Sequence, residues 1–144
     1  MAQRILIAGV GNILCGDDGF GVEVAGRLKK STLPDGVDVI DFGTRGVDLV
    51  YALLKGYDQV ILVDLLAHGG QPGEVRRQEV PLDKISHDSL SLHSMTPERV
   101  LGAAIALGAE LGKVTVIGCE PAGSPESEEP RIGLSPVVAA AVDR

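Results

Sequence analysis

Apolar residues are concentrated in short runs that end at glycines or acidic residues. Continuous apolar runs of this length are typical of strands that are covered on both faces of a sheet. The predicted buried strands span Arg4–Val10, Val37–Asp41, Val60–Val63 and Lys113–Cys119. A further segment, Glu74–Val80, alternates only weakly between apolar and polar residues, and we expect it to form an edge strand, which can run antiparallel to its neighbour.

The segments between these strands carry the signatures of helices. In the first, Phe20, Val24 and Leu28 recur at the spacing of one helix face, and Asp17 or Asp18 can cap its N-terminus. The other predicted helices span 47–54, follow a cap at Thr96, and begin at Ser135. Strands that alternate with helices predict an α/β fold, here a three-layer sandwich with a mostly parallel five-stranded sheet and helices on both faces. We expect residues 1–144 to form a single domain of this kind.

Composition and charge remove several classes of function. The chain has 144 residues, a net charge of −7 and 3% aromatic residues. An acidic chain without a basic cluster repels a phosphate backbone, and few aromatic rings are available to stack on bases, so we expect no nucleic-acid partner. No apolar run approaches the ~20 residues of a membrane span, so we expect no membrane association. Two cysteines, Cys15 and Cys119, are too few for a disulfide framework, and we expect a cytoplasmic protein with two free thiols. We also expect a monomer.

Acidic side chains follow predicted strands at the edge where α/β proteins bind their ligands. Ligands of open α/β sheets bind beyond the carboxyl ends of the strands. If the third strand pairs with the first, Asp18 and Asp64 become neighbours at this edge. Two carboxylates repel each other unless a proton or a cation lies between them. A nearby histidine would complete a nitrogen and oxygen ligand set suited to nickel, zinc, iron or manganese.

Three histidines compete to supply that nitrogen. His93 lies just before the helix that Thr96 caps, and the positive end of a helix favours the neutral, ligating form of imidazole. His68 lies in a glycine-rich loop, where we expect a solvated side chain. His87 lies in a polar loop, and its position offers no argument in its favour. His93 is therefore the preferred ligand.

Each candidate residue also has a purely structural interpretation. Asp17 or Asp18 can serve only as a helix cap, and Asp64 can simply end a strand. Cys119 closes a buried strand, as a small hydrophobic side chain would. Cys15 has a better claim to reactivity because it precedes the N-terminus of a predicted helix.

Single residues count against two common α/β functions. The segment GVGNIL begins like a dinucleotide-binding fingerprint, but Leu14 stands where the third glycine is needed, so we exclude NAD binding. A phosphate-receiver domain would share the paired acids after the first strand and the acid after the third. It would also need a lysine after the last strand, whereas Lys113 precedes that strand. The receiver interpretation is therefore disfavoured.

Six blocks of the sequence resemble the nickel-iron hydrogenase maturation endopeptidases in their order and spacing. They are GVGNILCGDDGFGVEVAGRL, DFGTRGVDLV, VILVDLLAHGGQPGEV, SLHSMTPERVLGAAIALG, VTVIGCEP and GLSPVV. The blocks cover nearly the whole chain, and GNxLxGDDGxG is a specific pattern. The resemblance implies an endopeptidase that trims the C-terminal extension of a hydrogenase large-subunit precursor. It also implies that trimming follows nickel insertion and uses the substrate's nickel as a recognition element.

The resemblance implies site residues as well. The three metal-contacting positions of the family correspond to Asp18, Asp64 and His93, the same trio that the strand ends favour. The first of these positions is Glu in some members and Asp in others. The substrate carries the nickel, and another divalent ion can occupy the site of the free enzyme. In this mechanism the nickel polarises the scissile carbonyl or a water, and Asp41, in the DFGTRG turn, is the candidate general base.

Two other classes of function remain open. The chain could be a carrier or sensor module that binds nickel without cutting anything, in which case a precursor incubated with it would keep its length. It could also be a thiol hydrolase that uses Cys15 or Cys119 together with His93. Alkylation of the thiols would distinguish this second alternative.

Overall fold

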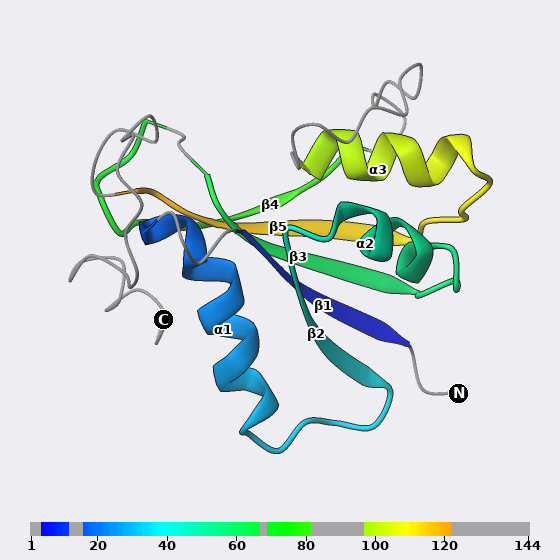
Figure 1. The fold of residues 1–144 in the computed structure, drawn as a ribbon, viewed down its shortest axis with the longest axis horizontal. Helices are drawn as coiled ribbons and strands as arrows, with labels where there is room; N and C mark the ends of the chain where they lie inside the picture. The colour runs from blue at the N-terminus through cyan, green and yellow to red at the C-terminus, as the bar shows by residue number, and fades with distance from the viewer. Residues whose placement is uncertain (1–3, 12–15, 67–68, 82–96, 122–144) are drawn as a thin grey trace.

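The apolar runs of the sequence form five strands of one sheet (Figure 1). The computed structural model describes residues 4–11, 16–66, 69–81 and 97–121. Its strands are β1 (Ile5–Val10), β2 (Val37–Gly43), β3 (Gln59–Leu65), β4 (Val75–Glu79) and β5 (Lys113–Cys119). Its helices are the 3-10 helix η1 (Gly16–Gly19) and the α-helices α1 (Phe20–Lys29), α2 (Gly46–Leu53) and α3 (Pro97–Ala106). None of these helices is long and apolar enough to cross a membrane.

The strands lie in the order β2-β1-β3-β5-β4. β1 pairs in parallel with β2 and with β3, and β3 pairs in parallel with β5, whereas β4 runs antiparallel along β5. The predicted, mostly parallel sheet with an antiparallel edge strand is therefore confirmed. β3 pairs with β1, which is the condition under which the sequence predicts Asp18 and Asp64 at one edge. Because four strands run in one direction, their carboxyl ends lie at one edge of the sheet, where ligands of such folds bind.

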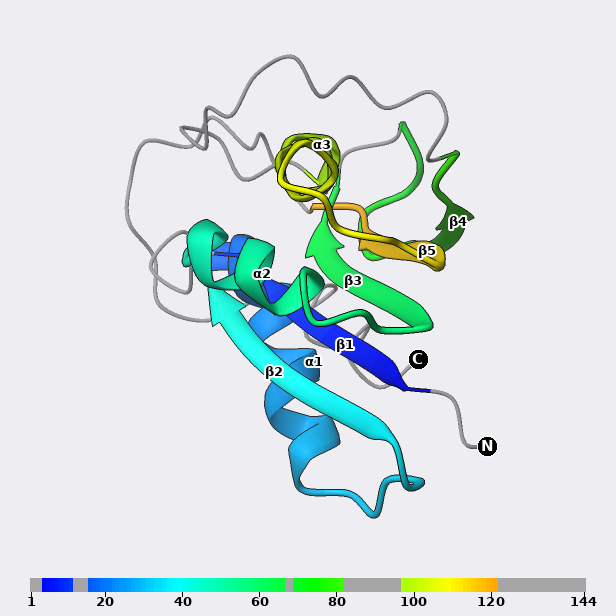
Figure 2. The same ribbon diagram turned by 90° about the vertical axis from the view of Figure 1, so that its right-hand side faces the viewer.

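Helices cover both faces of this sheet, as predicted for a three-layer sandwich (Figure 2). α1 packs against β1, β2 and β3 from one face, and α2 and α3 pack against each other on the other face. The larger core lies on the α2 and α3 face and includes the fully buried side chains of Leu6, Leu62 and Leu101. A smaller core on the α1 face includes Phe20 and Val63. Burial of each large apolar side chain stabilises the fold by about 1.5–3 kcal/mol.

Two strands are longer than the sequence pattern indicates, and the extension of β3 contains an acidic residue, Asp64. β2 reaches Gly43 and β3 reaches Leu65, so the predicted strand ends at Asp41 and at Val63 are wrong. Both acidic residues lie inside the sheet, with Asp41 opposite Gly9 and Asp64 opposite Gly118. A charged residue interrupts an apolar run, and therefore the run alone cannot show that backbone pairing continues through it.

The predicted cap of the first α-helix is also wrong. Asp17 and Asp18 lie inside η1, and α1 begins only at Phe20. Gly19 occupies the N-cap position, and no side chain makes a capping hydrogen bond there. A 3-10 turn therefore carries the paired acids, and the α-helix starts after them.

Two glycines let α1 contact the backbone of the sheet. A Cβ atom at Gly21 would lie 2.2 Å from the carbonyl oxygen of Val63 and 2.4 Å from that of Val10. A Cβ atom at Gly9 would lie 2.3 Å from the carbonyl oxygen of Gly21. The first turn of α1 therefore sits directly on the ends of β1 and β3, and this contact determines where the helix begins. As a result, η1 lies in contact with β3.

A polar cluster joins the opposite edge of the sheet, where β1, β2 and β3 begin. The Tyr57 hydroxyl donates a hydrogen bond to Oδ2 of Asp38 at 2.8 Å, and the Arg4 guanidinium lies 4.9 Å from the centre of the Tyr57 ring. The backbone N–H of Arg4 donates to Oδ2 of Asp58, also at 2.8 Å. Burial raises the pKa of Tyr57 above its ordinary value, as do the hydrogen bond to Asp38 and the charge of that residue, while Arg4 acts in the opposite direction.

Replacing Tyr57 by Phe should change how stability depends on pH. A raised pKa in the folded state means that the stabilisation is complete below the unfolded value of about 10 and is lost as the pH rises through the folded value. At neutral pH we expect Tyr57→Phe to lower the free energy of unfolding by about 0.5–1.5 kcal/mol, because one hydrogen bond to Asp38 is removed. The gap between the two proteins should shrink in urea unfolding curves as the pH rises above about 10. A gap that stays constant over this range would show that the phenol does not titrate as argued.

Candidate active site

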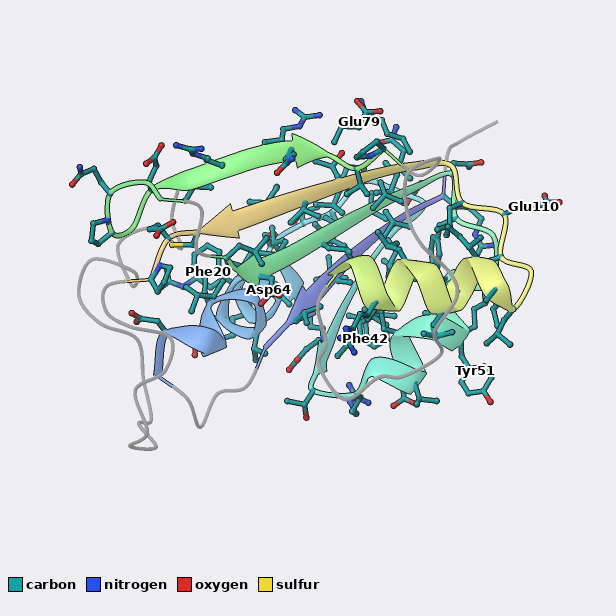
Figure 3. All side chains as sticks on the ribbon, turned by 90° about the horizontal axis from the view of Figure 1, so that it is seen from above. Phe20, Phe42, Tyr51, Asp64, Glu79 and Glu110 are labelled. Carbon is teal, nitrogen blue, oxygen red and sulfur yellow. The ribbon has the colours of Figure 1, made fainter. Side chains whose placement is uncertain are left out.

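Asp64 lies at the carboxyl edge of the sheet, on the strand that η1 contacts. Its residue is 6% exposed, and its Oδ1 accepts a hydrogen bond from the N–H of Leu65 at 2.8 Å. Figure 3 shows Asp64 near the tip of β3, at the end of the sheet where α1 begins. Burial of a carboxylate costs free energy unless hydrogen bonds or a cation compensate it. If position 64 served only to pack the core, an apolar side chain would stabilise the fold better than a carboxylate. Burial of Asp64 therefore indicates a role beyond packing.

The chain beyond Asp64 folds over the end of β5. Gly118 of β5 pairs with Asp64, and the Leu66 side chain lies 3.2 Å from the position that a Cβ atom of Gly118 would take. The N–H of Leu66 donates to the carbonyl oxygen of Cys119 at 3.0 Å. Asp64 therefore has an apolar neighbour, Leu66, on its β5 side, and a carboxylate beside an apolar surface is poorly screened by water.

η1 brings the backbone of a second predicted site residue, Asp18, to this edge. Asp18 is the third residue of η1, and Asp17 beside it is half-buried. The contact of η1 with β3 places the backbone of Asp18 at the same end of the sheet as Asp64. The side chain of Asp18 lies outside the described part of the structure, so the structure brings the two elements together without fixing the distance between their carboxylates.

Asp41 lies apart from Asp64. β1 separates β2 from β3, so the two acidic residues are two strand spacings apart, or about 10 Å. They also belong to opposite faces: Asp64 has the parity of Leu62 in the core beneath α2 and α3, whereas Phe42, next to Asp41, already occupies that face. The structure therefore does not bring Asp41 into direct contact with Asp64, and its role as general base stays a prediction.

Arg45 fixes the turn that follows Asp41. Its guanidinium donates hydrogen bonds to the carbonyl oxygens of Phe42 and Asp41, and it forms an ion pair with Asp48 at 3.4 Å. The pair with Asp48 is exposed, and such pairs contribute little to stability. The bonds to the two carbonyls are of more consequence, because they hold the DFGTRG turn and the start of α2 against the end of β2.

Comparison with known protein families shows to which family the chain belongs. The sequence profile of the family described as hydrogenase maturation protease matches residues 22–144. The chain belongs to the hydrogenase maturation protease family. It is therefore a peptide hydrolase, as the resemblance of its sequence blocks implied.

Individual relatives agree in sequence and in structure. The chain is 35% identical to the hydrogenase 2 maturation protease of Escherichia coli, over 98% of this chain and 85% of that protein. It is 38% identical to the hydrogenase expression/formation protein HupD of Rhizobium leguminosarum, over 83% of this chain, and the match spans 60% of that longer protein. The crystal structure of a hydrogenase 2 maturation peptidase from a Thaumarchaeota archaeon superposes with a TM-score of 0.72 at 37% identity, covering 98% of this chain and 92% of that one.

Several predicted site residues of this maturation protease lie outside the described residues. These are His93, His68, His87 and Cys15. Within the described residues, no group of three His, Cys, Asp or Glu side chains is arranged to hold a metal ion. Of the predicted trio, only the side chain of Asp64 is described, so the ligand set as a whole stays a prediction.

Cys119 is described, and its position is that of a core residue. It is 0% exposed and belongs to the small core formed with Phe20 and Val63. Its thiol lies 3.7 Å from the carbonyl oxygen of Glu120. A thiol that solvent and substrate cannot reach does not act as a nucleophile, so for Cys119 the hydrophobic interpretation is the better one.

Glu120 is a buried carboxylate at the same edge that the predicted trio does not include. Its N–H donates to the carbonyl oxygen of Glu74, and its own carbonyl oxygen accepts from the N–H of Gly73, both at 2.9 Å. These bonds attach the connection between β3 and β4 to the end of β5. Its place directly after the last buried strand was the only signal in the sequence, and that signal did not distinguish it from a solvated strand end.

Proposed function

We propose that this maturation protease removes the C-terminal extension of a nickel-iron hydrogenase large-subunit precursor after nickel insertion. The observation that carries the proposal is the buried carboxylate of Asp64 beside η1, in a chain of this protease family. A processing enzyme must recognise its substrate at the active site. A buried carboxylate, at the same edge of the sheet as the acidic turn η1, favours binding of a cation. The nickel already held by the substrate is such a cation.

In this proposal Asp18, Asp64 and His93 contact the substrate's nickel and hold the precursor in place. The two carboxylates supply hard oxygen ligands, and the imidazole supplies a nitrogen that a borderline metal prefers. Hydrolysis breaks the C–N bond of the scissile peptide, and water adds a hydroxyl group to the carbonyl carbon and a proton to the leaving amine. The nickel would polarise that carbonyl or the attacking water. Free enzyme can take up another divalent ion at the same ligands.

Asp41 is the proposed general base. Two strand spacings separate it from Asp64, so it would have to act on a water or peptide group that extends across the end of β1. The turn held by Arg45 would keep the Asp41 backbone in place during such a step. The monomeric state and the cytoplasmic setting belong to the same proposal, and the second rests on two cysteines being too few for a disulfide framework.

Processing should depend on nickel in the substrate. Purified protein is incubated with precursor that has been loaded with nickel and, in parallel, with metal-free precursor, and the shortening of each is followed by gel and by mass. We expect the loaded precursor to be shortened and the metal-free precursor to remain intact, because the three ligands would then have nothing to contact. Efficient cutting of metal-free precursor would rule out nickel as the recognition element.

The same experiment separates the carrier interpretation from the protease. A carrier or sensor would take nickel from the precursor, or bind beside it, and leave the precursor at full length. The family to which the chain belongs favours the protease.

A further inference from the structure

α2 is apolar on both its inner and its outer face. Leu49, Val50, Ala52 and Leu53 are buried against the sheet and α3. On the outer side, Val47 is 54% exposed, Tyr51 is 63% exposed and Leu54, directly after the helix, is 37% exposed. Asp48 is the only charged residue of the helix. A surface helix normally carries polar residues on its outer face, so a helix that is apolar all round is expected to be covered.

The three exposed side chains form a continuous stripe, which we call the α2 stripe (Val47, Tyr51 and Leu54). At about 100° per residue, positions i, i+4 and i+7 fall within an arc of about 60° on one side of a helix. At about 1.5 Å per residue the stripe is about 10 Å long. Figure 3 shows Tyr51 on the outer side of α2, directed away from the sheet.

The stripe begins at the carboxyl edge of the sheet, the edge of the candidate active site. Arg45 binds the carbonyl oxygens of Phe42 and Asp41 at the end of β2, and its own carbonyl oxygen accepts from the N–H of Leu49 at 3.2 Å. These bonds fix the first turn of α2, with Val47 in it, to the end of β2. The start of the stripe therefore lies at the same edge of the sheet as the candidate active site.

The size of the stripe distinguishes between its two plausible occupants, a second copy of this chain and a protein substrate. Complete burial of the three side chains would remove on the order of 300 Å² from solvent. A stable dimer requires about 1,200–2,000 Å² in total. The stripe is therefore too small to hold a permanent partner alone, but it suits one part of a contact whose other part is the active site.

We propose that the α2 stripe docks an apolar surface of the hydrogenase large-subunit precursor during processing. This inference rests on the proposed function, which supplies a folded protein as substrate. The stripe would contribute to binding of the precursor and not to the chemical step, because its side chains carry no group that can act on a peptide bond. Its loss should raise KM and leave kcat unchanged.

The double variant Val47→Gln/Tyr51→Gln tests this inference. Glutamine is a good helix former and places an uncharged polar group on the stripe. The matched control is Leu107→Gln, since Leu107 is 56% exposed and follows α3 at the end that leads into the start of β5, away from the candidate site. We expect the double variant to raise KM for nickel-loaded precursor, and Kd for the same precursor, by about tenfold or more, with kcat within about twofold of wild type. Leu107→Gln should match wild type.

The outcomes separate this inference from the proposed function. If wild type processes the precursor and the double variant has unchanged KM and Kd, the docking role is wrong. The proposed function is not affected by that result. A fall in kcat at constant KM also overturns it, as does an equal effect of Leu107→Gln. Sedimentation that shows a wild-type dimer, and a monomeric double variant, assigns the stripe to a second copy instead. Wild type that neither binds nor cuts the precursor overturns both proposals.

Discussion

Replacing Asp64 by Asn should lower the rate of precursor processing by at least about a hundredfold while the protein stays folded. Loss of groups that merely support a metal ligand already costs about 10–100-fold, and Asp64 is proposed as a ligand itself. Asparagine keeps the size of the side chain and an oxygen that can accept the hydrogen bond from the N–H of Leu65. The negative charge is lost, and with it the attraction for the substrate's nickel. Processing rates of nickel-loaded precursor, with circular dichroism of each variant, measure the effect.

Asp58 supplies the matched control, because it lies directly before the other end of the same strand. Its carboxylate accepts a hydrogen bond from the backbone N–H of Arg4, and Asp58→Asn keeps an oxygen for that bond. We expect Asp58→Asn to process the precursor at a rate close to that of wild type. A folded Asp64→Asn variant that is as active as Asp58→Asn would remove Asp64 from the site.

Replacing Gly21 by Ala should destabilise the fold by about 3 kcal/mol or more. The new Cβ atom would lie 2.2 Å from the carbonyl oxygen of Val63 and 2.8 Å from the backbone nitrogen of Val10. Both contacts are with backbone atoms of the sheet, which cannot rotate away as a side chain could. Either α1 moves off the sheet or the ends of β1 and β3 separate, and overpacking of this kind costs free energy. Urea unfolding of wild type and variant measures the difference.

Gly26→Ala makes the same chemical change in the same helix and should have the opposite sign. A Cβ atom at Gly26 meets nothing within 4 Å, so the substitution removes the conformational freedom of glycine without creating a clash. We expect a gain in the free energy of unfolding of about 0.5–1 kcal/mol. If both substitutions change the free energy of unfolding alike, α1 does not contact the backbone of β1 and β3 at Gly21 as described.

The topology could be predicted from the sequence because it depends on features that are local in the chain. Each buried strand is a continuous apolar run, and the weak alternation of 74–80 marked the segment that became the antiparallel edge strand β4. The third strand lies beside the first, as the placement of Asp18 and Asp64 at one edge required. The family followed from blocks spread over the whole chain, and the family comparison bears it out.

The errors concern positions that are decided by contacts between distant segments. Asp17 and Asp18 are good cap residues, but the contact of Gly21 with Val10 and Val63 places the helix start after them. Asp64 continues β3 because Gly118 of β5 pairs with it, and β5 is some fifty residues away in the chain. Neither contact can be predicted from the residues that neighbour Asp18 or Asp64 in the sequence.

The relation between the site residues was the hardest to foresee. Asp41 and Asp64 both follow apolar runs in the sequence and look equivalent there. The strand order shows that β1 lies between them. The core contacts of Phe42 and Leu62 show that the two acids belong to opposite faces of the sheet.

The mass of the intact hydrogenase large-subunit precursor, before and after incubation with this protein, tests the central claim most directly. Nickel-loaded precursor should lose one peptide from its C-terminus and keep its N-terminus, giving a single product of lower mass. The Asp64→Asn variant should give almost none of this product in the same time. An unchanged precursor mass after incubation with folded wild-type protein, or cuts at several unrelated positions, would contradict the assignment of this chain as a C-terminal processing protease.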